Sequence, residues 1–324
     1  GIVDVLRGVN DLLTAGIAIT AFSLLLYALS FNLRDRVARS FAIILVCVVF
    51  VSVGDSIASN TYSTSQLEFW MRVQWVGIIF LPPAYLHFSD ALLETTGRPS
   101  RGRRRRLVWV MYAVSFGFVL LLPTDWLVGP VVENVAPAPY LQKTSLTWFF
   151  AFYYLSAMLV SGINFWRAYE RTVTRTSRRR MRYLLIGALG PILGSYPFLL
   201  FGSSLAENHS LIFWTAATFG SLMVSVLLVL MAYAVAFFGV SWPDRVVKRR
   251  LFKWLMRGPV TASVILALVT LVSRYGPRFG LSNPIAVPIV TVTSLLVMEH
   301  LITLVAPIWE RWLFNGGNPN KLQL

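Results

Sequence analysis

The sequence carries little charge for its length. Asp, Glu, Lys and Arg make up 13% of its 324 residues, whereas about 25% is usual in soluble domains. Hydrophobic residues make up 56% and gather in runs of about 17–25 residues, the length that a helix needs to cross the hydrocarbon core of a bilayer. The shortage of charge argues against a soluble domain and indicates an integral helical membrane protein.

Cysteine and histidine are scarce as well, which restricts the chemistry that the chain can carry. The single cysteine, Cys47, lies in an apolar run and cannot form an internal disulfide or a cysteine-rich metal site. None of the three histidines has a metal-binding spacing, since "MEHL" at 298–301 lacks the second histidine of H-E-x-x-H. The sequence contains no phosphate-binding loop or nucleophile elbow. We therefore expect no metal, no cofactor and no enzyme activity in this chain.

The apolar runs predict an all-α polytopic membrane protein with nine transmembrane helices. Seven of them form one domain over residues 11–237, and the last two form a hairpin over residues 259–310. Residues 1–10 are expected outside the membrane, and residues 311–324 are expected to form a cytoplasmic tail or a junction to a further domain. The predicted spans cover residues 11–31, 40–58, 69–93, 107–122, 146–166, 183–201, 211–237, 259–272 and 284–307.

Positive charge is distributed unevenly between the connections. The net charge is +15, and 24 of the 29 Lys and Arg residues fall in alternate hydrophilic segments, including "RGRRRR" at 101–106. This is the positive-inside bias of membrane proteins, and it places the N-terminus outside and the C-terminus in the cytoplasm. The basic segments therefore indicate orientation in a bacterial inner membrane and not a nucleic-acid partner.

The connections predicted on the outer side are too short to fold as domains. The longest covers residues 123–144, and its prolines and glycine argue against regular structure. A stimulus would therefore have to act within the membrane or be small enough to enter between the helices.

Residues 238–258 predict a cytoplasmic amphipathic helix that links the two groups of spans. Ser241, Pro243 and Asp244 are typical of a helix N-terminus. The helix is expected to lie in the membrane interface, where basic residues attract anionic lipid headgroups. The residues assigned to this contact are Arg245, Lys248, Arg249, Lys253 and Trp254. The helix either serves only as a linker or also relays a conformational change.

Ionisable residues within the predicted spans are costly and therefore suggest function. The segment "PAYLHFSDALL" at 83–93 places His87 and Asp90 three residues apart, on one face of the third span. Glu299 and His300 lie at a similar depth in the ninth span. We hypothesise that these two pairs contact each other across the bundle. The alternative is that each pair meets a local Ser, Asn or cytoplasmic Arg.

Depth along the spans separates the individual polar residues. Asp90 is expected near the cytoplasmic surface, within reach of water, while His87 lies one turn deeper. Asp55 lies toward the outer end of the second span, and we expect it to pair with Arg72 just across the outer connection. A structural ion pair is the preferred interpretation of Asp55, and a proton carrier is the alternative.

Glycine and proline mark places where helices can approach closely or bend. In the sixth span, Gly190 and Gly194 are four residues apart, the small-xxx-small spacing of close helix packing, and Pro191 removes a backbone donor. Packing is the preferred interpretation, and a ligand cavity beside a kink is the alternative. The adjacent Pro82 and Pro83 predict a bend in the third span.

The segment "FWMRVQWVGIIFLPPAYLHFSDALL" at 69–93 resembles part of the N-terminal seven-span region of bacterial sensor histidine kinases. In that family an aromatic-rich third span often begins W-x-R-x-x-W/Y-x-G and continues through a proline. The residues at those places are Trp70, Arg72, Trp75, Gly77 and Pro82. The ending "WERWLFNGG" at 309–317 also looks like the membrane exit that precedes cytoplasmic GAF and kinase modules in some of these proteins.

The resemblance covers about residues 11–237 and implies a membrane-embedded sensory or anchoring module. Such a module would pass a change in helix packing through the ninth span, toward Trp312 and Phe314, to cytoplasmic signalling domains. The chain departs from the family by the amphipathic helix and two added spans. It also lacks a cytoplasmic phosphoacceptor histidine and an ATP-binding lobe, so the resemblance does not extend to kinase activity.

Several alternatives stay open at this point. Because the chain begins with Gly1 and ends in a Gly- and Asn-rich segment, we expect it to be part of a longer protein. An accessory subunit of a larger membrane complex is the second hypothesis, and a small-molecule transporter or membrane enzyme is the third. The partners expected are anionic lipids, cytoplasmic signalling domains or other membrane subunits, and a second copy of the chain in a homodimer.

Overall fold

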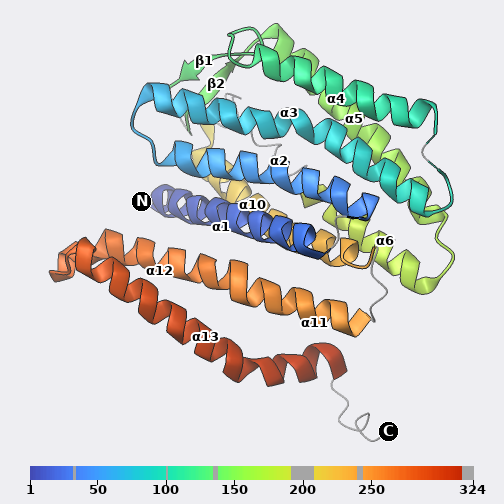
Figure 1. Ribbon diagram of the computed structural model, residues 1–324. Helices are drawn as coiled ribbons and strands as arrows, with labels where there is room; N and C mark the ends of the chain where they lie inside the picture. The colour runs from blue at the N-terminus through green and yellow to red at the C-terminus, as the bar shows by residue number, and fades with distance from the viewer. Residues whose placement is uncertain (32–33, 100, 134–137, 191–207, 239–243, 316–324) are drawn as a thin grey trace, which may run out of the picture. The chain divides into compact units, whose positions relative to one another are not determined.

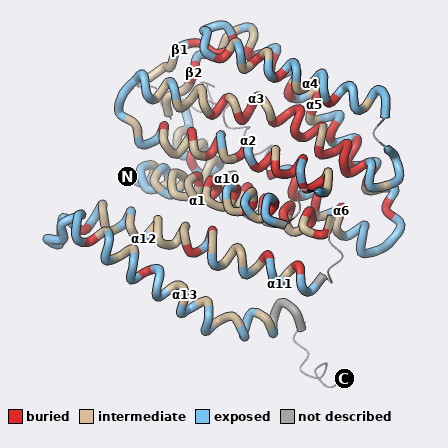
Figure 2. Tube along the Cα trace, viewed as in Figure 1, coloured by how far each residue is buried: buried red, intermediate tan, exposed pale blue. Residues whose placement is uncertain are grey.

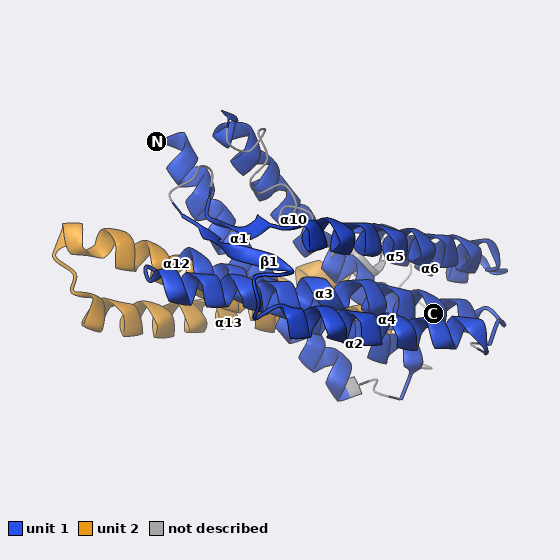
Figure 3. Ribbon diagram, turned by 90° about the horizontal axis from the view of Figure 1, so that it is seen from above, with its two compact units in different colours: residues 1–240 blue, residues 241–324 orange. Residues whose placement is uncertain are grey.

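The computed structural model divides the chain into two compact units, Gly1–Val240 and Ser241–Leu324 (Figure 3). The first unit consists of long helices and one two-stranded sheet, and the second is helical in its described part. The structure describes residues 1–31, 34–99, 101–133, 138–190, 208–238 and 244–315.

The helices of the first unit run back and forth, so that the arginine-rich turns meet at one end of it (Figure 1). The helices are α1 (Ile2–Phe31), α2 (Arg36–Ser59), α3 (Thr64–Thr95), α4 (Arg103–Leu121), α5 (Ser145–Glu170), α6 (Arg175–Gly187) and α10 (Ser210–Val235). Capping residues fix the start of two of these helices. At the start of α2, the Asp35 carboxylate accepts a hydrogen bond from the Val37 amide, and at the start of α5, Thr144 and Thr147 form a capping box.

The second unit contains a long helical run followed by an antiparallel helix. Its elements are α11 (Asp244–Leu255), a π-helical turn (Met256–Val260), α12 (Thr261–Tyr275), a 3-10 turn (Gly276–Phe279) and α13 (Asn283–Asn315). The hydroxyl of Thr261 donates to the carbonyl of Met256 at 2.7 Å, within the π-helical turn that contains Pro259. The predicted amphipathic helix and eighth span therefore form one continuous helical run.

Seven helical segments in the described residues are long and apolar enough to cross a membrane. Two of the nine predicted spans are not among them. Residues 107–122 fall in α4, whose first turn carries four consecutive arginines. Much of the span predicted at 183–201 lies outside the described residues. The count of nine spans therefore stays a prediction. The seven segments are Ile2–Ser30, Arg36–Ser59, Thr64–Thr95, Ser145–Glu170, Ser210–Val235, Arg245–Phe279 and Asn283–Arg311.

Helix α3 is the most deeply buried of these segments and packs against α2, α4 and α5 (Figure 2). It continues through Pro82 and Pro83. Because Pro83 has no N–H, it cannot donate to the carbonyl of Ile79 one turn earlier. The hydroxyl of Ser115 on α4 donates to that carbonyl instead, at 2.8 Å. A side chain of the neighbouring helix thus replaces the hydrogen bond that the proline removes.

The outer connection between α4 and α5 was expected to lack regular structure, and that expectation is wrong. Strands β1 (Val128–Val132) and β2 (Tyr140–Lys143) pair as an antiparallel hairpin, with an irregularity in register between Val128 and Val131. The prolines are tolerated because a two-stranded ribbon has only edge strands, where a missing donor is permitted. The fold is therefore mostly helical with one small sheet, which corrects the all-α prediction.

Glycine permits close contact between α2 and α3. A Cβ atom at Gly77 would come within 2.8 Å of Val51 Cγ2 and closer still to the carbonyl oxygen of Cys47. At Gly190, a Cβ atom would lie 2.9 Å from the Cβ of Leu227 on α10, in agreement with a packing role. Pro191 and Gly194 lie outside the described residues.

We predict that Gly77→Ala destabilises the bundle by about 1–3 kcal/mol, because the added methyl group forces α2 away from α3. Gly117→Ala on α4 is the matched control, since a Cβ atom there meets nothing within 4 Å and alanine favours helix. Denaturant unfolding of both variants in the same detergent measures the difference. Equal stability of the two variants would contradict the predicted steric contact.

Candidate functional site

The polar groups of the first unit concentrate at the two ends of α3. One group surrounds Arg72, near the start of the helix, and the other surrounds Asp90, near its end. Between them the helix is mostly apolar and buried. Each group joins α3 to different neighbours.

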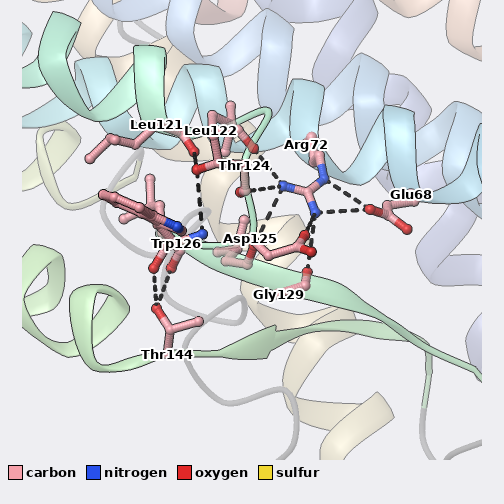
Figure 4. Close-up of polar contacts among 11 residues, drawn as sticks. Glu68, Arg72, Leu121, Leu122, Thr124, Asp125, Trp126, Gly129 and Thr144 are labelled. Carbon is pink, nitrogen blue, oxygen red and sulfur yellow. Dashed lines mark hydrogen bonds and ion pairs between the residues drawn. The ribbon is translucent and has the colours of Figure 1, made fainter.

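Arg72 holds the outer connection against α3 (Figure 4). Its guanidinium lies 2.8 Å from Glu68 Oε1 on the same helix and 3.0 Å from Asp125 Oδ1. It also donates to four backbone carbonyls, those of Leu122, Thr124, Val128 and Gly129. Arginine has five N–H donors in a planar group, which suits it to bind several oxygens at once. One side chain therefore fixes the entry into the β-hairpin.

The start of α5 binds the same connection from the other side. The hydroxyls of Thr144 and Thr147 both donate to the carbonyl of Leu127, and Thr144 also donates to that of Trp126. Nearby, burial lowers the pKa of Lys143, whose ammonium lies 5.5 Å from the centre of the Trp148 ring. The hairpin is thus attached to α3 and α5 together.

The predicted pairing of Asp55 with Arg72 is wrong. Asp55 accepts from the side-chain amide of Gln74 at 3.3 Å, whereas Arg72 is occupied by Glu68 and Asp125. Arg72 and Gln74 are two residues apart on α3, so their side chains leave the helix in different directions. The prediction considered nearness along the chain and did not consider which face of the helix each residue occupies.

Asp90 lies at the centre of the second group. Its carboxylate lies 2.9 Å from Arg36 Nη2 and 2.9 Å from Arg104 Nε, and Arg36 also pairs with Glu94. Asp90 is only 1% exposed, so the expectation that it reaches water is wrong. The alternative of a local Arg partner is the arrangement found. Because Arg36 is the first residue of α2 and Arg104 lies in the first turn of α4, one buried carboxylate joins three helices.

His87 lies one turn before Asp90 and contacts α4. Its Nδ1 atom forms a 3.1 Å hydrogen bond with the hydroxyl of Tyr112, and the two rings meet edge to face with centroids 5.9 Å apart. Glu299 and His300 belong to α13 in the second unit. Their predicted contact with His87 or Asp90 stays a prediction.

A cavity of about 480 Å³ opens between α2, α3 and α4 beside this group. Three arginines, one carboxylate and three aromatic rings surround it. Its lining residues are Arg36, Arg39, Ile43, His87, Glu94, Arg105, Val108, Trp109 and Tyr112. In the described residues no group of three or more His, Cys, Asp or Glu side chains is arranged to hold a metal ion. The chemistry of the cavity is therefore that of a cationic pocket with aromatic walls.

Further polar contacts connect α3 to α5 and to the residue that follows α6. The Tyr85 hydroxyl donates to the carbonyl of Ala188 after α6, at 2.6 Å. The side-chain amide of Asn164 on α5 donates to the hydroxyl of Ser89 at 3.2 Å, where both residues are buried. Single buried hydrogen bonds of this kind fix the rotation of a helix within a membrane bundle more than they add stability.

The aromatic motif of the third span has packing roles. Trp75 is buried and its ring meets that of Phe150 on α5 at 5.7 Å. Gly77 permits the close approach of α2, and Pro82 is buried within α3. Trp70 contacts the ring of Phe69 at 5.4 Å. Arg72 is the one member of this motif that makes ion pairs.

Sequence analysis missed several residues of the two groups. Arg36 and Arg104 were counted only as evidence for orientation, and Glu94, Tyr112 and Asp125 were not singled out. One signal was available: Asp90 and Glu94 are four residues apart, which places two carboxylates on one face of α3. Arginine-rich segments precede the second and the fourth predicted spans, which neighbour the third span along the chain. Two acidic side chains at the end of the third span therefore indicate ion pairs with these arginines.

A family model described as the N-terminal 7TM region of histidine kinase matches residues 13–212 of the chain. The match covers more than half of the sequence, so the chain belongs to this family, and the predicted resemblance is confirmed. Among curated proteins, none matches significantly. The chain is therefore a multi-pass membrane module of the sensory region of a histidine kinase. Both polar groups of α3 lie within the matched residues.

We predict that Asp90→Asn lowers the free energy of unfolding by about 2 kcal/mol, because two arginines lose a buried charged acceptor. The matched control is Asp125→Asn, whose side chain is 69% exposed and whose partner Arg72 keeps Glu68. This control is expected to cost less than about 1 kcal/mol. Denaturant unfolding in detergent compares the two variants, and equal losses would show that the Asp90 group does not stabilise the bundle.

Proposed function

We propose that this chain, as a member of the histidine-kinase 7TM family, senses a stimulus in the outer half of the membrane. In this proposal the N-terminus lies outside a bacterial inner membrane and the C-terminus lies in the cytoplasm. The stimulus alters helix packing, and the change reaches cytoplasmic signalling domains. The distribution of arginines supports the orientation, since basic turns favour the cytoplasmic side.

The observation that carries this proposal is the position of the two polar groups on one helix. Arg72 and Asp90 are 18 residues apart on α3, which corresponds to about 27 Å at 1.5 Å per residue. The hydrocarbon core of a bilayer is about 30 Å thick. The two groups therefore suit opposite membrane interfaces, and α3 is a direct connection between them.

Helix α3 is suited to transmit a displacement. Its interior positions pack closely on α2, α4 and α5, and packed interiors rearrange between discrete states instead of deforming gradually. A ligand that binds beside the Arg72 group would shift the population of these states only if it binds one of them more tightly. At the other end, the same shift would strain the ion pairs of Asp90 with Arg36 and Arg104.

The second unit offers a route for the output. Within it, Arg249 of α11 pairs with Glu310 of α13 at 3.0 Å, and the rings of Phe252 and Trp309 lie 5.8 Å apart. Displacement of α11 would therefore move the C-terminal part of α13. In α11, Val247 is buried and the basic residues Arg245, Arg249 and Lys253 are exposed. This pattern supports an interfacial position among anionic headgroups.

We predict that Arg72→Gln raises amide hydrogen exchange at the far end of α3, in the connection over residues 96–102. Loss of the outer group loosens α3, and the looser helix weakens the Asp90 ion pairs. Hydrogen-exchange mass spectrometry of the 324-residue chain in lipid nanodiscs measures this effect. Arg7→Gln is the control, because Arg7 is an exposed arginine on α1 whose described contact is with the Trp214 ring. A change confined to residues 122–147 would refute transmission through α3.

The orientation predicts which introduced cysteines can be labelled from outside. In a chain with Cys47→Ala, Ser65→Cys should react with a membrane-impermeant maleimide on intact spheroplasts. Arg101→Cys should react only after the membrane is opened. The Cys47→Ala chain without an added cysteine gives the background. The reverse pattern would overturn the proposed orientation while leaving the family assignment unchanged.

A further inference from the structure

We propose that the cavity between α2, α3 and α4 binds the phosphate headgroup of an anionic phospholipid. The inference concerns binding alone and does not rest on the proposed signalling role.

Two arginines of the cavity are not committed to the ion pairs of Asp90. Arg36 is bound by Asp90 and Glu94. Arg39 and Arg105, by contrast, are exposed, and in the described part of the chain neither takes part in an ion pair. They come from different helices and line the same cavity. Guanidinium groups bind phosphate oxygens through paired, charge-assisted hydrogen bonds. The arrangement is therefore suited to a phosphate held between α2 and α4.

The size of the cavity and its inner wall suit such a group. A volume of about 480 Å³ lies within the usual range of ligand sites, about 300–1,000 Å³. The hydrogen-bonded ring of His87 and the hydroxyl of Tyr112 form a polar wall behind the arginines. The ion pairs of Arg36 with the buried Asp90 and with Glu94 hold the neighbouring helix ends in place, so the cavity is formed before a ligand arrives.

The opening of the cavity favours a lipid over a soluble phosphate. Trp109 lies one turn beyond Arg105 on α4 and is 66% exposed. Ile43 and Val108 add apolar surface to the lining. A phospholipid likewise carries a charged phosphate next to apolar chains. Tryptophan is enriched at the level of the membrane where headgroups meet the hydrocarbon core. Basic sites on the cytoplasmic side also attract anionic lipids.

The test is native mass spectrometry of the 324-residue chain, released from micelles that contain equal amounts of phosphatidylglycerol and phosphatidylcholine. We expect one phosphatidylglycerol to be retained in preference to phosphatidylcholine. The double variant Arg39→Gln/Arg105→Gln should lower its affinity at least about tenfold, since each lost charge-assisted hydrogen bond costs about that factor. Ile43→Trp, which fills the cavity without changing charge, should also lower retention.

The matched control is Arg101→Gln/Arg103→Gln, which removes the same charge from exposed residues outside the cavity lining. It should keep the wild-type affinity. Equal losses in the two double variants would show non-specific attraction and overturn the site. Equal retention of both lipids would also overturn it. Displacement of the lipid by inorganic phosphate at sub-millimolar concentration would overturn the assignment to a lipid.

Discussion

The buried carboxylate of Asp90 is the constraint on which one end of the first unit depends. Its two oxygens are bound by arginines in the first turns of α2 and α4, which both pack against α3. A buried carboxylate is tolerated only with such partners, because an unpaired charge there would be costly. The need to satisfy one charge therefore brings three helix ends together, and one of the two arginines, Arg36, also lines the adjacent cavity.

The opposite end of α3 has the reverse arrangement of charges. There a single cation, Arg72, collects two carboxylates and several backbone carbonyls from the connection that leads into the hairpin. Between the two ends, α3 is held by close packing at Gly77 and by a hydroxyl from α4 that replaces the hydrogen bond lost at Pro83. Helix α3 is thus held at both ends by ion pairs and between them by close packing.

Charge serves two purposes in the arginine-rich turns, and composition alone does not separate them. The number of positive residues in these turns is the basis of the proposed orientation in the membrane. Particular members, Arg36 and Arg104, also neutralise Asp90, whereas Arg39 and Arg105 line the open cavity. Which arginine takes which role depends on the direction in which its side chain leaves the helix.

The sequence by itself determined the membrane class, the long helices and the family, because the length and apolarity of each span and the aromatic motif are local properties. It also singled out His87, Asp90, Asp55 and Arg72 as unusual. Only the tertiary structure decided their partners. Asp55 meets Gln74 and not Arg72, and Asp90 is paired instead of hydrated, since partners depend on helix rotation and on side chains distant in the chain. The hairpin at β1 and β2 likewise required pairing between segments that show no strand pattern by themselves.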